Sequence, residues 1–213
     1  MSDNRESKRL IIITGPQGSG NHLFSKIFNM HPDVNGWDFG ERYWIPSDEE
    51  PFAEAWVNPE KTKDFLTHDL MVANVSVPFV YDGVKQVPKI QQVIHEAEDA
   101  GYVVQVCVVV RDRNINALQQ ERVRNAVTLP TAMEYYRTLE CDMNFVSHES
   151  LYLHKNMYLR WLSRILDFPI DSENPILYDI LLEDQNNKYV RYVEEHWLDA
   201  EVWKGLRPKK ERK

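Results

Sequence analysis

The first regular pattern along the chain is a short apolar run near the amino terminus. Residues 10–13 are four apolar β-strand formers in succession, which indicates a buried strand. A turn of glycine, proline and serine follows, and apolar residues then recur at helical spacing over residues 23–30. This order predicts a strand, a tight loop and a helix.

A second apolar run, over residues 102–110, contains six valines and predicts a central parallel strand with helices on both faces. One helix is predicted before it, from Pro88 to a C-cap at Gly101, and another after it, ending at about Asn125. Open α/β sheets bind ligands at the carboxyl ends of central strands, so the charged cluster that begins at Arg111 is a candidate site. A solvated turn is the alternative.

The other segments continue the alternation of helices and strands. The pattern predicts a helix over residues 58–73, a β-rich segment over 75–84, and a short strand over 144–147. A capping box at residues 131–134 opens a further helix. Two amphipathic helices come last, one with the apolar residues Met157, Trp161, Leu162, Ile165 and Leu166, and one with Tyr189, Val193 and Trp197.

Length and composition fit one globular domain. We expect a single three-layer α/β domain over residues 1–213, with a mostly parallel central sheet flanked by helices and flexible tails at 1–8 and 205–213. No apolar run approaches the roughly 18 residues that a membrane span needs. The net charge of −8 argues against a nucleic-acid-binding protein.

Targeting signals and cysteines give two further expectations. Residues 1–9 are polar and lack the apolar stretch of a secretory signal, which predicts a cytoplasmic location. Cys107 lies in the valine run and Cys141 in a predicted helix, and their spacing matches neither a disulfide framework nor a metal site. Both are expected to be reduced.

The glycine-rich loop has the chemistry of an anion site. From Gly15 to Gly20 its spacing matches the first six positions of a P-loop, but Asn21 and His22 stand where a nucleoside triphosphatase has Lys and Ser or Thr. Backbone N–H groups and the positive end of a helix dipole would converge there on a phosphate or sulfate. The loop, however, lacks two groups that ATP or GTP hydrolysis uses, the lysine that contacts the β- and γ-phosphates and the hydroxyl that binds magnesium. The alternative is a turn that only joins strand to helix.

Five segments, in order, resemble sulfotransferases that use 3′-phosphoadenosine-5′-phosphosulfate (PAPS). The loop at Gly15 and the helix that ends at His31-Pro32-Asp33-Val34 are similar to the family's 5′-phosphosulfate-binding loop and the helix after it. The other four segments are Gly40-Glu41-Arg42-Tyr43-Trp44, Lys85 followed by Pro88, Arg111-Asp112 at the end of the valine run, and residues 147–151 with the helix after them. Together they span residues 10–170.

The resemblance implies a P-loop-like sulfotransferase core that binds PAPS, releases adenosine 3′,5′-bisphosphate (PAP) and needs no metal. It assigns the 3′-phosphate to Arg111 with help from Gln119, the general-base role to Glu41, and stabilisation of the leaving oxygen to Lys85. It assigns the 5′-phosphosulfate to the loop residues Gly15, Gly18, Ser19, Gly20, Asn21 and His22.

Three positions depart from the family's pattern. Gly18 stands where the family usually has a basic residue, so Lys85 or His22 would have to supply that charge. Arg113 replaces a proline, and Gln119 replaces a serine at the 3′-phosphate, although its amide can still donate a hydrogen bond. Glu41 as a surface charge and Lys85 as a solvated side chain are the alternatives to their catalytic roles.

The leading interpretation is a cytoplasmic sulfotransferase that acts on a hydroxyl or amine of a small-molecule or carbohydrate acceptor. Two alternatives remain: a nucleotide or small-molecule kinase with a degenerate P-loop, and a non-catalytic nucleotide-binding module of the same fold. A long segment after the first predicted helix is rich in aromatic residues. Four of its side chains are candidates for stacking on the acceptor: Trp37, Phe39, Tyr43 and Trp44. The oligomeric state is open.

Overall fold

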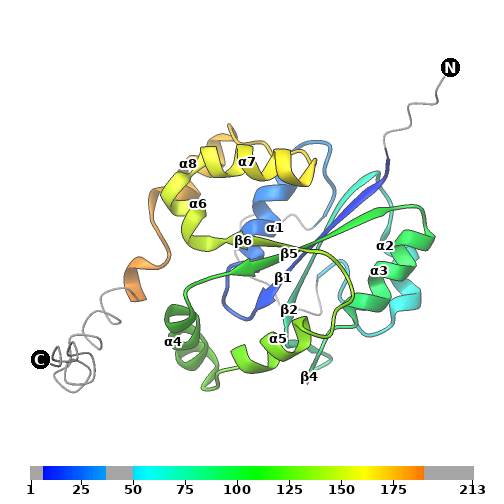
Figure 1. Ribbon diagram of the computed structural model, residues 1–213, viewed down its shortest axis with the longest axis horizontal. Coiled ribbons are helices and arrows are strands. Elements are labelled where there is room, and N and C mark those ends of the chain that lie inside the picture. Colours follow the sequence, from blue (N-terminus) through cyan, green and yellow to red (C-terminus); the bar gives the residue numbers. More distant parts are fainter. Residues whose placement is uncertain (1–6, 37–49, 190–213) are drawn as a thin grey trace, which may run out of the picture.

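A four-stranded parallel sheet forms the centre of the protein, whose computed structural model describes residues 7–36 and 50–189 (Figure 1). The strand order is β2-β1-β5-β6, and every neighbouring pair is parallel. The bounds are Arg9–Pro16 for β1, Leu70–Val77 for β2, Val103–Val110 for β5 and Met143–Ser147 for β6. The predicted α/β fold with a parallel sheet between helices is confirmed.

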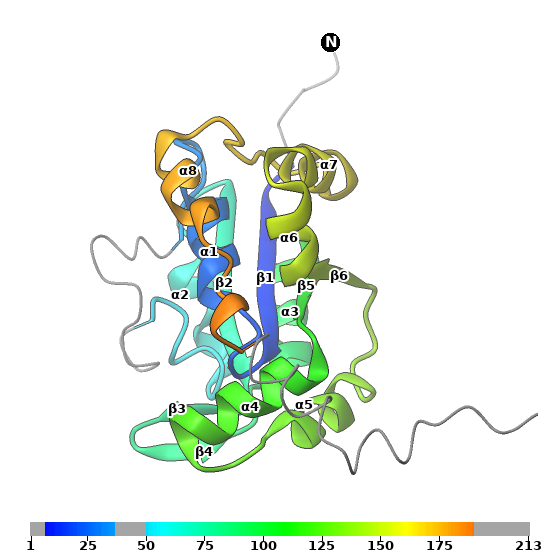
Figure 2. The same ribbon diagram turned by 90° about the vertical axis from the view of Figure 1, so that its left-hand side faces the viewer.

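Helices cover both faces of the sheet, which explains why β1 is apolar at successive positions. Ile11 and Ile13 face a core that includes α1, α6, α7 and α8, whereas Leu10 and Ile12 face a second core with α3 and α5 (Figures 1 and 2). The first group comprises α1 (Asn21–Asn29), α6 (His148–His154), α7 (Asn156–Leu166) and α8 (Pro175–Leu182). The second comprises α3 (Ile90–Asp99) and α5 (Leu129–Tyr136).

The remaining elements lie around these layers. Helix α4 (Arg113–Arg124) begins directly after β5, at the edge where the strands end. A short 3-10 turn, η2 (Pro59–Lys61), leads into α2 (Thr62–Phe65), and β3 (Phe79–Tyr81) pairs with β4 (Val84–Gln86) in a separate hairpin. None of the helices in the described residues has both the length and the apolar character needed to cross a bilayer.

The register of the sheet brings four positions that are distant in the sequence together at the carboxyl ends of the strands. Gly15 of β1 lies opposite Ser76 of β2, and the last residue of β5 lies opposite Ser147, the last residue of β6. Arg111 and His148 immediately follow those last residues. The loop after β1, the end of β2, and the starts of the segments after β5 and β6 therefore surround one space.

The prediction of a helix over residues 58–73 is wrong in its second half. Helical structure ends at Phe65, and β2 begins at Leu70. The segment from Leu70 onward forms hydrogen bonds with β1 over the full length of that strand. This pairing outweighs the local helical preference, as non-local contacts often do for short apolar segments.

The start of α5 and the position of Cys141 also differ from the prediction. Helix α5 begins at Leu129, before the expected capping box, because the buried amide of Gln120 accepts the N–H groups of Thr128 and Leu129, at 2.7 and 3.1 Å. Pro130 fits the first turn, where no N–H donor is needed. Cys141 lies between α5 and β6 rather than in a helix. Cys107 and Cys141 are both free thiols.

Helix α7 presents a different face to the core from the one predicted. Leu162 and Leu166 are buried as expected, but Met157, Trp161 and Ile165 are 73%, 51% and 54% exposed. Tyr158 and Leu159 take the inward positions. The helix is apolar around most of its circumference, so spacing alone did not identify the buried side. Of the last predicted helix, only Tyr189 lies within the described residues, and it is buried.

Candidate functional site

The loop after β1 has the backbone conformation of an anion cradle. Gly18 and Gly20 have φ angles of 81° and 108°, in the left-handed region that side-chain-bearing residues rarely adopt. A Cβ on Gly20 would also lie 2.7 Å from Cδ2 of His148. The chain then enters α1, whose first N–H groups have no acceptor within the helix. Donor groups and the positive helix end thus meet at the loop.

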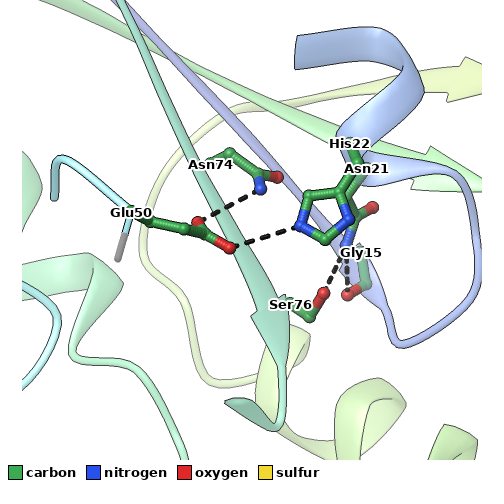
Figure 3. A network of polar contacts seen from close by, with 6 residues as sticks. All are labelled: Gly15, Asn21, His22, Glu50, Asn74 and Ser76. Atoms are coloured by element: carbon green, nitrogen blue, oxygen red, sulfur yellow. Dashed lines mark hydrogen bonds and ion pairs between the residues drawn. The ribbon is translucent and has the colours of Figure 1, made fainter. Parts of the chain in front are cut away.

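Buried side chains hold this loop in place (Figure 3). Asn21 Nδ2 donates to the Gly15 carbonyl oxygen and to Ser76 Oγ, each at 3.1 Å. Ser19 Oγ in turn donates to Asn21 Oδ1 at 2.8 Å. Ser19 and Asn21 are 1% and 3% exposed. Their polar atoms therefore support the loop from within, and its backbone N–H groups are the natural donors for an anion.

A cavity of about 650 Å³ opens above the loop. It brings together six residues predicted for the site, which are Gly18, Gly20, Asn21, His22, Arg111 and Gln119. Arg124 and Lys188 add two further cations to its wall, and no Asp or Glu is found among the described residues that line it. In a chain with a net charge of −8, this concentrates positive charge at one point and favours an anionic ligand.

Arg111 reaches across the cavity wall to the loop. Its Nη1 donates to the Gly18 carbonyl at 2.7 Å and also to Oε1 of Gln119, and its Nε donates to Oδ1 of Asn186 at 2.7 Å. Burial lowers the pKa of the guanidinium, which nonetheless stays charged because an arginine pKa begins so high. Gln119 therefore has its amide nitrogen, rather than its oxygen, available for a ligand.

The segment after α8 fixes Arg111 from its other side. Asn186 is 3% exposed, and its Nδ2 donates to Glu149 Oε1 at 3.0 Å. The guanidinium also lies over the ring of Tyr189, 5.4 Å from its centroid. Gln185 and Lys188 of the same segment line the cavity. Arg111 is thus held by neighbours from three parts of the chain.

His22 forms a pair with a buried carboxylate (Figure 3). Its Nε2 lies 3.2 Å from Oε1 of Glu50, and Asn74 Nδ2 donates to the other carboxylate oxygen, also at 3.2 Å. Glu50 is 8% exposed, and burial raises its pKa above the usual range. Because His22 lies at the cavity wall, the pair can exchange a proton with a bound molecule and hold the resulting charge.

His148 forms a neutral part of the same wall. The residue is 2% exposed, and its Nδ1 is buried without a hydrogen-bond partner among the described residues. Burial, and then the charge of Arg111, lower its pKa to about 3. The imidazole is therefore uncharged near neutral pH, and it supports Gly20 by packing against it.

Two residues predicted for catalysis, Lys85 and Glu41, are not placed at the cavity by the described structure, and the predicted loop residues Gly15 and Ser19 do not line it. Lys85 is exposed on β4, opposite Val80, and does not line the cavity. Glu41 lies in the stretch 37–49, outside the described residues. Their catalytic roles stay predictions.

Four residues of the site were missed by sequence analysis: Glu50, Arg124, His148 and Lys188. Glu50 and Lys188 lie in segments without a motif, and only tertiary structure brings them to α1 and α4. Arg124 is the last residue of α4 and resembles any basic residue at a helix end. His148 does follow a predicted strand, and ligand sites gather at strand ends, so its position was the one usable signal.

Comparison with known proteins adds no assignment. The chain matches no model of a known protein family, and no curated protein matches it. The resemblance to sulfotransferases therefore depends on the motifs in the sequence, and its functional meaning depends on the geometry of the cavity.

Proposed function

We propose that this protein binds PAPS at the loop after β1 and transfers its sulfuryl group to a hydroxyl or amine of a small-molecule or carbohydrate acceptor. The observation that carries the proposal is the meeting of two elements in one cavity. The glycine loop at the start of α1 and the Arg111 guanidinium from the end of β5 are joined by a 2.7 Å hydrogen bond to the Gly18 carbonyl. PAPS has two anionic ends, which suit two such groups.

The composition of the cavity supports a nucleotide of this kind. Its volume of about 650 Å³ falls within the usual range for small-molecule sites. The loop N–H groups would hold the 5′-phosphosulfate, and Arg111 with the Gln119 amide nitrogen would hold the 3′-phosphate. Lys188 and Arg124 would supply positive charge that Gly18 does not. A Walker-type lysine is absent, which disfavours the kinase alternative.

The His22–Glu50 pair supplies a candidate acid–base group. PAPS provides the sulfuryl group, whose transfer replaces the bond from sulfur to the 5′-phosphate oxygen by a bond to the acceptor oxygen or nitrogen. We assign removal of the acceptor proton to His22, with the Glu50 carboxylate stabilising the charged imidazole at 3.2 Å. Glu41 is the second candidate for this role.

Calorimetric titration tests the binding step. We expect PAP to bind without magnesium and more tightly than Mg-ATP, and Arg111→Ala to weaken PAP about tenfold to a hundredfold, since charge-assisted hydrogen bonds are lost. Arg164→Ala, which removes an exposed arginine of α7, is the matched control and should leave the affinity unchanged. A preference for Mg-ATP would contradict the proposal.

Transfer of labelled sulfuryl groups tests the role of His22. His22→Gln should slow transfer from PAPS to a panel of hydroxyl and amine acceptors by about a hundredfold or more, because a general base is removed. PAP affinity should change less than about threefold, since the loop N–H groups remain. An unchanged transfer rate would remove His22 from the mechanism, and Glu41→Gln would then be the next variant to measure.

A non-catalytic nucleotide-binding module is the second candidate. It is favoured by the exposed position of Lys85 on β4, away from the cavity, where it cannot stabilise a leaving oxygen. PAP binding without transfer to any acceptor of the panel would support this candidate over the enzyme.

A further inference from the structure

A second cavity, of about 660 Å³, lies between β5, β6, α4 and α5. Pro16 and Ser19 of the loop contribute to its wall, and Arg111 borders both this cavity and the one above the loop. The rest of the wall comes from residues that the first cavity does not use. The second cavity is therefore a separate space beside the proposed PAPS site.

The floor of this second cavity is apolar and open to solvent. β5 contributes Val108 and Val110, and β6, the edge strand of the sheet, contributes Met143 and Phe145. Phe145 is 62% exposed, and Met133 of α5 is 47% exposed. An apolar, concave surface of this kind that stays accessible to water is typical of a ligand site.

Two arginines at the same cavity place positive charge beside its apolar floor. Arg113 at the start of α4 and Arg137 after α5 are exposed, and neither side chain has a hydrogen bond or ion pair with another residue in the described ranges 7–36 and 50–189. Glu134 is the one acidic residue among the described residues of the lining. The guanidinium groups therefore leave a positive charge beside the apolar floor, and such groups match a carboxylate well.

We propose that this second cavity binds a small amphipathic anion, an aromatic carboxylate whose ring packs on Phe145, Met133 and Met143 while its carboxylate contacts Arg113 and Arg137. Apolar contact supplies affinity, and the two arginines select for the negative charge. This binding site does not depend on PAPS binding, because the two cavities share only Arg111, whereas the proposed carboxylate contacts, Arg113 and Arg137, belong to the second cavity alone.

Methionine methyl groups give a direct test on the full chain. The protein is labelled with ¹³C at the methionine methyl groups, assigned by single Met→Leu variants, and titrated with 2-naphthoate. We expect saturable shifts at Met133 and Met143 and none at Met157, which is 73% exposed on α7 and serves as an internal control for non-specific adsorption. No shift at Met133 and Met143, or shifts of equal affinity at Met157, would overturn the proposal.

Charge selectivity is tested in the same titration. The neutral analogue 2-naphthamide should bind at least about tenfold more weakly, and Arg113→Ala with Arg137→Ala should weaken 2-naphthoate by a similar factor, since charge-assisted contacts are lost. Arg164→Ala is the control for a general loss of positive charge. Both replaced side chains are exposed, so the variants should fold. Equal affinity for carboxylate and amide would overturn the role of the arginines.

Discussion

His148 illustrates how single residues of the site are tuned by their surroundings. A histidine with an ordinary pKa would be partly charged near neutral pH, but this one packs on the loop glycine, lies near Arg111 and is kept neutral. Glu50 is tuned in the opposite sense, because burial raises its pKa and His22 and Asn74 then stabilise its charged form. His148 thus supports the loop and Glu50 positions His22, and the shifted pKa values make the stability of the fold depend on pH.

The pKa of His148 predicts a loss of stability on acidification. Its folded value of about 3 lies below the ordinary value of 6.5, so the stabilisation is complete above pH 6.5 and is lost as the pH falls toward 3. Between about pH 7 and about pH 5 this residue should remove on the order of 2 kcal/mol from the free energy of unfolding.

Urea unfolding of the wild type and of His148→Gln at the two pH values measures this contribution. The glutamine variant carries no titrating group at position 148, so its stability should fall less between the two conditions than that of the wild type. Parallel pH dependence in the two proteins would show that His148 is not held neutral by the fold.

At the scale of elements, local patterns predicted the strands with the strongest apolar runs. The runs at residues 10–13 and 102–110 became β1 and β5, because strands buried on both faces need apolar residues at successive positions. Helix α5 was misplaced because its cap comes from α4, in a side chain that no local rule includes. The buried face of helix α7 was predicted wrongly, because Tyr158 and Leu159 are apolar as well as Met157 and Trp161, and it is the first two that pack into the core.

Gln120 connects secondary-structure elements, and its replacement should lower the stability of the fold. It is fully buried and accepts from the N–H groups of Thr128 and Leu129, while its Nε2 donates to the Gln17 carbonyl at 2.6 Å. Gln120→Ala should lower the free energy of unfolding by about 2–4 kcal/mol, because several buried polar groups lose their partner.

Chemical denaturation checks this prediction, with Gln92→Ala as the matched control. Gln92 is exposed on α3, and its replacement should change stability by less than about 0.5 kcal/mol. A similar effect of the two variants would mean that the amide of Gln120 does not connect α4, α5 and the loop as described.

At the scale of the whole molecule, the site arises from the meeting of strand ends. Sequence analysis predicted the loop and Arg111 because each follows a strand in a recognisable pattern, and it predicted Gln119 from the resemblance to sulfotransferases. It missed Glu50, Arg124 and Lys188, because their positions depend on how distant segments pack around the sheet edge. The positive cavity within an acidic protein is likewise a property of the fold, since the net charge alone suggests the opposite.

Calorimetric titration with two nucleotides shows whether Arg111 pairs with the 3′-phosphate. PAP and adenosine 5′-monophosphate, which lacks the 3′-phosphate, are titrated into the wild type and into Arg111→Ala. We expect the variant to lose about tenfold to a hundredfold in affinity for PAP but less than about threefold for the monophosphate. Equal losses for both nucleotides would contradict this pairing.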